Sequence, residues 1–330
     1  SVGGTFTYSS GTTSVISVSG STLTVAGVGT SVITATFTPT NTTNYNTATT
    51  TMTVTVGKGS PTFSAWSNVS KNFGDSAFTV TAPSVTGSVA GSFTYSSATT
   101  SVISVSGTTL TVVGVGTSVI TATFTPTDST NYNSATTTMT VTVGAGSQSI
   151  TRTSTSPTSP VKSGTYTPTA TASSTLPVAI TIAAGSSSVC SISAGVVTFN
   201  TAGSCVIQYN QSGNSNYSAA TQLTETLSIG KATPTFSAWS DISKNYGDSG
   251  FTVTAPSVTG SIPGSFSYSS ATTSVIGVSG STLTVAGAGT SVITATFTPT
   301  DTTNYNSATT TMTVTVSKAV LSITASSHTV

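Results

Sequence analysis

The chain carries one long segment three times, and this repetition constrains its fold more than any other feature. The copy that begins at Gly91 returns from Gly264 with few changes, and it also occurs from Gly4. Because Ser1 aligns with Ser88, the repeating unit has about 87 residues. The sequence therefore predicts a tandem series of similar domains.

The period divides the chain into four units and a remnant. They are residues 1–57, a partial unit without the part equivalent to 58–87, then 58–144, 145–230 and 231–317, and finally 318–330, the expected first strand of a further unit. The third unit diverges most but keeps the order of its landmarks. Only a few residues separate the units, so we expect restricted joints and an elongated array, with each unit adding roughly 35 to 45 Å.

Periodicity within each unit predicts an all-β fold. Ser and Thr number 61 and 78, yet Val, Ile and Phe alternate with them, as in strands with one apolar and one hydroxyl face. Turn residues bound about seven short strands per unit, which predicts an antiparallel β-sandwich of immunoglobulin type. The expected inward residues are Ile120, Ala122, Phe124, Met139, Val141 and Val143 in the second unit, and Ile293, Ala295, Phe297, Met312, Val314 and Val316 in the fourth.

Charged residues make up only 4% of the chain, with a formal net charge of +1. This composition lacks the basic surface that nucleic acids or anionic lipids require, and no apolar run is long enough for a membrane helix. His328 is the only histidine, so one chain cannot form a histidine pair for acid–base or metal chemistry. Four of the five aspartates recur at equivalent turns, where we expect them to cap their own backbone, and they are Asp75, Asp248, Asp128 and Asp301. We therefore expect neither an enzyme nor a cofactor or metal site.

Two cysteines, Cys190 and Cys205, lie 15 positions apart in the third unit. The spacing suits two strands of one sandwich joined by a disulfide, and the alternatives are a metal pair or two free buried thiols. A metal site would need further Cys or His residues nearby, and the sequence has none there. We predict the disulfide, which implies an oxidising compartment.

Trp66 and Trp239 occupy the same place in the motif Phe-Ser-Ala-Trp-Ser, within the expected first strand of their units. An exposed tryptophan there could stack on the sugar rings of a surface glycan, whereas a buried one packs at the edge of the sandwich or at the interface with the preceding unit. We favour the packing role, because large aromatic residues in repeats usually serve packing. The tyrosines that follow an asparagine in each unit are expected to plug the loop between the last two strands. They are Tyr45, Tyr132, Tyr217 and Tyr305.

The turn and core motifs of these units resemble the tandem bacterial Ig-like repeats of large secreted and surface proteins. The fourth unit carries them as Tyr246-Gly247-Asp248, Tyr268-Ser269-Ser270, Gly289-Thr290, Ile293-Thr294-Ala295 and Asn304-Tyr305. The third unit resembles a cysteine-bearing variant, through Val189-Cys190 and Gly203-Ser204-Cys205. The resemblance implies an extracellular stalk, adhesin or fibre segment, and it brings no catalytic residues.

The leading functional hypothesis is a non-catalytic structural or adhesive segment on a bacterial cell surface, with other copies or neighbouring repeats as partners. A carbohydrate-binding module and a phage or virion fibre are the alternatives. Exposed Trp66 and Trp239 beside amide side chains would favour the carbohydrate-binding module. The interrupted repeats at both ends predict a window of a longer protein. The second interpretation is strand addition, in which residues 319–327 pair with residues 1–57 of another copy.

Overall fold

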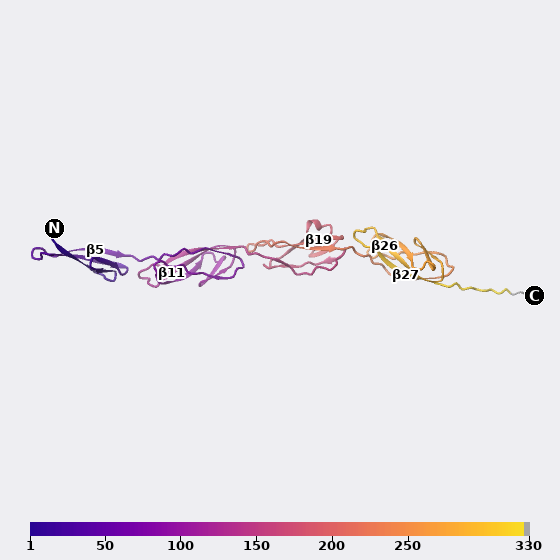
Figure 1. The fold of residues 1–330 in the computed structure, drawn as a ribbon, viewed down its shortest axis with the longest axis horizontal. Coiled ribbons are helices and arrows are strands. Elements are labelled where there is room, and N and C mark those ends of the chain that lie inside the picture. Colours follow the sequence, from indigo (N-terminus) through magenta and orange to yellow (C-terminus); the bar gives the residue numbers. More distant parts are fainter. Residues whose placement is uncertain (327–330) are drawn as a thin grey trace, which may run out of the picture. The chain divides into compact units, whose positions relative to one another are not determined.

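The computed structural model describes residues 1–326, in which nearly all regular structure is β-strand. Within that range the single helical element is the 3-10 turn η1, Ala184–Ser186. The chain forms two compact units. The first consists of Ser1–Ser147 with the loop Gly213–Ser218, and the second of Gln148–Ser212 with Ala219–Val330. Each contains repeats that can be followed by colour in Figure 1.

The second repeat is a two-sheet sandwich. One sheet has the order β6-β12-β11-β8 and the other the order β7-β10-β9. Their strands are β6 (Val69–Asn72), β7 (Phe78–Thr79), β8 (Gly91–Ser97), β9 (Ile103–Ser106), β10 (Thr109–Val112), β11 (Gly116–Pro126) and β12 (Ala135–Gly144). All pairs are antiparallel except β6 with β12, which run parallel. Seven strands in a four-plus-three arrangement are typical of immunoglobulin-like domains.

The expected alternation along the strands is confirmed. All six predicted inward residues of the second repeat are at most 3% exposed, while Thr residues between them face outward or lie at intermediate depth. Leu110 and Ile103 from one sheet pack with Ile120 and Met139 from the other in a single core. Slipping a strand by one residue would bury its Thr row, so this core fixes the register.

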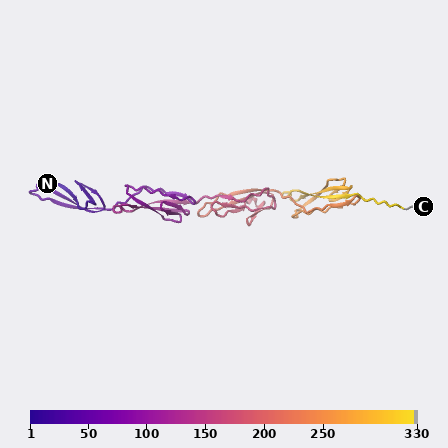
Figure 2. The same ribbon diagram turned by 90° about the horizontal axis from the view of Figure 1, so that it is seen from below.

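The fourth repeat reproduces this sandwich, and its six predicted inward residues are also buried. Its sheets have the orders β21-β27-β26-β23 and β22-β25-β24, and Figure 2 shows its strands from a second direction. Their bounds are β21 (Ile242–Asn245), β22 (Phe251–Thr252), β23 (Gly264–Ser270), β24 (Ile276–Ser279), β25 (Thr282–Val285), β26 (Gly289–Pro299) and β27 (Ala308–Ser317).

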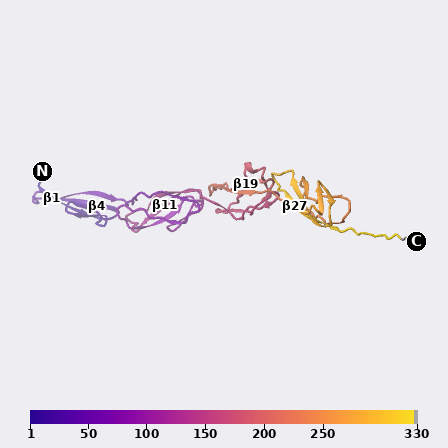
Figure 3. The same cartoon turned by 45° about the vertical axis from the view of Figure 1, so that its right-hand side comes forward.

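The first repeat contains only the later strands. It has one sheet of order β1-β4-β5 and a hairpin β2-β3, and Figure 3 labels β1 and β4. Their bounds are β1 (Gly4–Ser10), β2 (Ile16–Ser19), β3 (Thr22–Val25), β4 (Gly29–Pro39) and β5 (Ala48–Val56). Met52 is 51% exposed there, whereas its counterpart Met139 is 3% exposed. Residues between Ser64 and Ser84 of the second repeat lie around Met139, and the first repeat has no equivalent of this segment.

The third repeat departs from this plan, because its eight strands lie in three sheets. Its sheets are β13-β15, β14-β18-β17 and β16-β19-β20. Their strands are β13 (Ile150–Arg152), β14 (Thr165–Tyr166), β15 (Ala170–Ala172), β16 (Ala179–Ile182), β17 (Cys190–Ser193), β18 (Val196–Phe199), β19 (Gly203–Asn210) and β20 (Leu223–Ile229).

Residues 318–326, expected to begin a further repeat, lie outside strands. Leu321 and Ile323 are 90% and 95% exposed there. A strand needs a partner for its backbone groups, and the described residues pair with none of this segment. The expected first strand therefore stays a prediction.

Candidate functional site

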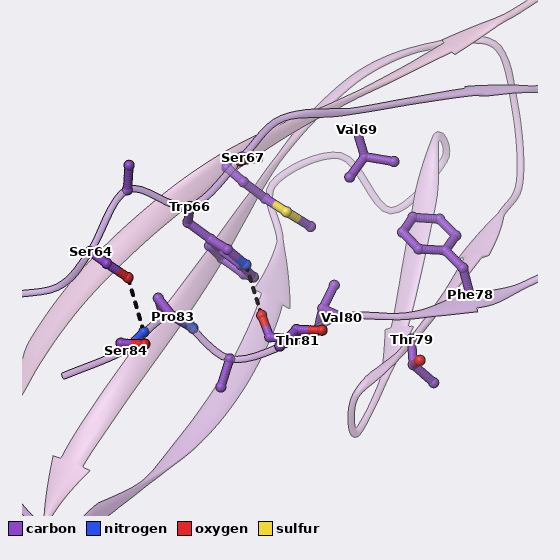
Figure 4. A pocket seen from close by; sticks show the side chains of 13 residues that line it. Ser64, Trp66, Ser67, Val69, Phe78, Thr79, Val80, Thr81, Pro83 and Ser84 are labelled. Atoms are coloured by element: carbon purple, nitrogen blue, oxygen red, sulfur yellow. Dashed lines mark hydrogen bonds between the residues drawn. The ribbon is translucent and has the colours of Figure 1, made fainter.

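Trp66 lies beside a hollow of about 390 Å³ on the second repeat, drawn in Figure 4. Its indole is half-buried, packs against Tyr95 with 5.9 Å between ring centroids, and donates its Nε1–H to the Thr81 carbonyl at 3.0 Å. Trp66 precedes β6 and Trp239 precedes β21, and neither is part of a strand, so the expected place of both in a first strand is wrong. The side chain of Trp66 reaches the core from an irregular segment that residues around Thr81 hold in place.

Trp239 repeats this geometry in the fourth repeat. Its Nε1–H donates to the Thr254 carbonyl at 3.0 Å, and its ring lies 5.9 Å from that of Tyr268. Both indole N–H groups are therefore used within the protein. The residues that line the hollow beside Trp66 include Ser, Thr and apolar side chains but no Asn or Gln. Amides of the kind that would orient a sugar are not among them.

The third repeat contains a disulfide between Cys190 and Cys205, whose Cα atoms are 5.8 Å apart. The bond joins the start of β17 to β19, and both residues are fully buried. Ile103 and Ser118 occupy the matching positions of the second repeat and are buried there without a covalent link. The sandwich itself thus forms with or without the bond.

A buried acid, Glu225, lies in the core of the same repeat, at the position that Met139 and Met312 occupy in its neighbours. Its carboxylate accepts hydrogen bonds from the Tyr209 hydroxyl at 2.5 Å and the Ser156 hydroxyl at 2.6 Å. Arg152 forms a salt bridge with it. Burial, followed by the hydrogen bond to Glu225, raises the pKa of Tyr209. The polar groups of this cluster therefore pair with one another inside the repeat.

No group of three or more His, Cys, Asp or Glu residues that could hold a metal ion occurs among residues 1–326. His328, singled out in the sequence, lies outside the described residues. No helix in the described part of the chain is long and apolar enough to cross a membrane.

The aspartates expected to cap turns do so. Asp75 accepts from the Asn72 N–H at 2.9 Å, and Asp248 accepts from the Asn245 N–H at 2.9 Å. Asp128 accepts from the N–H groups of Thr130 and Asn131, both at 3.1 Å.

The loop after β11 also holds a contact that periodicity did not reveal. There the side chain of Asn131 reaches the turn of the first repeat and accepts from the Val28 N–H at 2.9 Å. The two residues are about one repeat apart in the chain. The only sequence signal was the recurrence of asparagine before each of the four loop tyrosines.

Comparison with known proteins identifies no family. No family model matches the sequence, and no curated protein matches it. Solved structures with similar strand arrangements include Drosophila N-cadherin EC1-4, with 12% identity, a TM-score of 0.23 and coverage of 94% of this chain and 92% of that one. Sidekick-1 immunoglobulin domains 1–5 have 13% identity, a TM-score of 0.30 and coverage of 96% and 74%.

Domains 4–9 of the surface layer protein SbsC have 17% identity and a TM-score of 0.20. The match covers 94% of this chain and 57% of that structure. Identities and TM-scores at these levels establish no relationship.

Proposed function

We propose that this chain is a non-catalytic structural segment of an extracellular bacterial surface protein, acting as a spacer or fibre building block. The observation that carries the proposal is the way in which the short linkers are bonded. Gly59 donates its N–H to the Asn131 carbonyl at 2.8 Å and accepts from the Asn133 N–H at 2.8 Å. Ala232 makes the same pair of bonds with Asn304 and Asn306, both at 2.9 Å.

Linkers bonded in this way have few residues that are free to bend between one repeat and the next. Gly59 lies only three residues after Val56, where β5 of the first repeat ends. Such a linker cannot act as a free coil, and a spacer needs this restriction to hold a partner at a distance.

Chemistry and compartment support the same role. The buried Glu225 cluster is internally satisfied, the described residues offer no metal cluster, and the charged fraction of the chain is 4%. A disulfide persists in an oxidising environment, which favours a location outside the cytoplasm. The resemblance of the turn motifs to bacterial Ig-like repeats adds the surface setting.

Small-angle X-ray scattering of the full chain tests the spacer role. A compact protein of this length has a radius of gyration of about 20 Å. Four repeats of about 40 Å each, arranged in series, form a rod about 160 Å long. The radius of gyration of a thin rod is its length divided by the square root of twelve, which gives about 45 Å. We expect a value near the larger figure. A radius near 20 Å would overturn the proposal, since folded-back repeats cannot act as a spacer.

A further inference from the structure

Neighbouring repeats share a side-chain contact that recurs in both compact units. In the first unit, the Val28 N–H of the first repeat donates to Asn131 Oδ1 of the second repeat at 2.9 Å. In the second unit, the Ala202 N–H of the third repeat donates to Asn304 Oδ1 of the fourth repeat at 2.7 Å. The same loop position thus reaches the same turn position of the repeat before it.

An aspartate three residues earlier orients the side-chain amide of each asparagine. Asn131 Nδ2 donates to Asp128 Oδ2 at 2.7 Å, and Asn304 Nδ2 donates to Asp301 Oδ2 at 2.7 Å. An ionised carboxylate only accepts hydrogen bonds, so it must face the NH₂ end of the amide. The amide oxygen then points away from the loop. A backbone N–H only donates, and it is therefore the matching partner for that oxygen.

The receiving turn is built to present one N–H. In the first repeat, Ala26 and Gly27 donate to the Val15 carbonyl at 2.8 and 3.3 Å, which leaves the next N–H, that of Val28, directed outward. Gly29 has a φ of +142°, and a Cβ there would lie 2.9 Å from Val15. A side chain at Gly29 would therefore distort the turn that holds Val28.

The loop of the third repeat differs, because no aspartate lies three residues before Asn216 and Asn214 lies two residues before it. Asn214 still accepts from the backbone N–H groups of Asn216 and Tyr217, at 2.9 and 3.0 Å. The contact of Asn216 Oδ1 with the Val115 N–H, within the first compact unit, is longer, at 3.4 Å. The longer distance coincides with a loop that lacks the carboxylate and has one residue fewer before the asparagine.

We propose that the loops after β11 and β26 are joints, which bind the second repeat to the first and the fourth repeat to the third. Asn131 and Asn304 make the contact, and Asp128 and Asp301 are positioning residues that orient them. The partner surface is the partly buried backbone N–H of a turn in an adjacent Ig-like repeat, where a glycine, Gly29 or Gly203, follows the donor residue. The inference rests on the proposed spacer function for its purpose, since it names the contact that would restrict the repeats.

Hydrogen exchange of single amides in the full chain, followed by NMR, tests the joint. Asn304→Ala removes the acceptor, so we expect the Ala202 N–H to exchange roughly 2- to 10-fold faster, the effect of losing one net hydrogen bond. The Val28 N–H should keep its rate. Asn131→Ala should give the opposite pattern, with Val28 faster and Ala202 unchanged. Unchanged exchange of Ala202 in the Asn304→Ala variant would overturn the proposal.

Two further variants separate a joint from a loop cap. Asp301→Asn keeps the shape of the loop but removes the carboxylate, and we expect a smaller acceleration at Ala202. Asn44→Ala alters the equivalent residue of the first repeat, whose side chain has no inter-repeat partner among residues 1–326, and should leave both amides unchanged. A purely local cap would accelerate only amides near Asn304. Because scattering reports extension independently, failure of the joint leaves the spacer test intact.

Discussion

Asp128 and Asp301 each accept hydrogen bonds from the asparagine of the same loop. An ionised carboxylate accepts such bonds more strongly than a neutral acid does. The side-chain amide of Asn131 lowers the pKa of Asp128 below its ordinary value of 3.8, with the Asn131 backbone N–H as the next cause. The Asn304 side chain lowers the pKa of Asp301 in the same way. The cations that face these carboxylates are Lys58 and Lys162, respectively.

Because the pKa of Asp128 is lowered in the folded protein, its contribution to stability depends on pH in a defined direction. The folded form binds the proton more weakly than the unfolded form, so the stabilising contribution is complete above about pH 4 and is lost as pH falls through the folded pKa. We expect NMR titration of the Asn131 side-chain NH₂ to give a midpoint below 3.8. Asp128→Asn should remove this titration while the strands persist. A midpoint at or above 3.8 would contradict the assigned hydrogen bond.

The strands show how far the sequence could predict the structure. The alternation of apolar and polar residues predicted the inward faces of β11, β12, β26 and β27. A strand with one buried face shows this alternation within a few residues of sequence, so a local pattern is enough to find it. Trp66 was placed in a strand wrongly, since an apolar residue looks the same in an irregular segment that packs on the core. The parallel pairing of β6 depends on β12, about 70 residues away, and no local pattern reports it.

The contacts of Asn131 with Val28 and of Asn304 with Ala202 could not be predicted either, because no local pattern reports a contact between distant segments. The two ends of each contact lie in different repeats, and the sequence shows only that asparagine recurs before the loop tyrosine. The Glu225 cluster did leave a signal, because Glu225 interrupts the apolar face of β20. An acid at an inward position predicts partners, yet the partners Arg152, Ser156 and Tyr209 come from segments that only the fold brings together.

At the level of strand β20, Glu225→Met tests whether the third repeat depends on its polar core. The change would match Met139 and Met312 in shape but would leave Arg152 without its partner. Removing one member of a buried pair costs about 3 to 5 kcal/mol, and we expect about 2 to 3 because the Arg152 side chain is 33% exposed. Hydrogen exchange of β19 amides measures the loss of stability.

A double variant provides the control for this pair. Adding Arg152→Met to Glu225→Met removes the unpaired charge, so the double variant should be more stable than Glu225→Met alone. If the two changes destabilise the repeat additively, the charges are not coupled and the cluster does not act as a unit.

For the whole molecule, the central question is whether the repeats unfold separately. Each has its own buried cluster, and none of these clusters combines residues from two repeats. The disulfide lies only in the third repeat, and the two tryptophans lie only in the second and fourth. A reducing agent can therefore perturb the third repeat alone, while tryptophan fluorescence reports on the unfolding of the second and fourth repeats.

Reduction of the disulfide should lower the free energy of unfolding of the third repeat by about 3 kcal/mol. This is the entropic stabilisation expected from closing a loop between residues 15 positions apart in the unfolded chain. Exchange of β19 amides would report this loss. The unfolding midpoint followed by fluorescence of Trp66 and Trp239 should stay unchanged, because those residues pack only within their own repeats. A joint that contributes one hydrogen bond restricts orientation without coupling the cores. If reduction instead shifts the tryptophan transition by a comparable amount, the repeats unfold together, and the joints carry far more energy than a single hydrogen bond supplies.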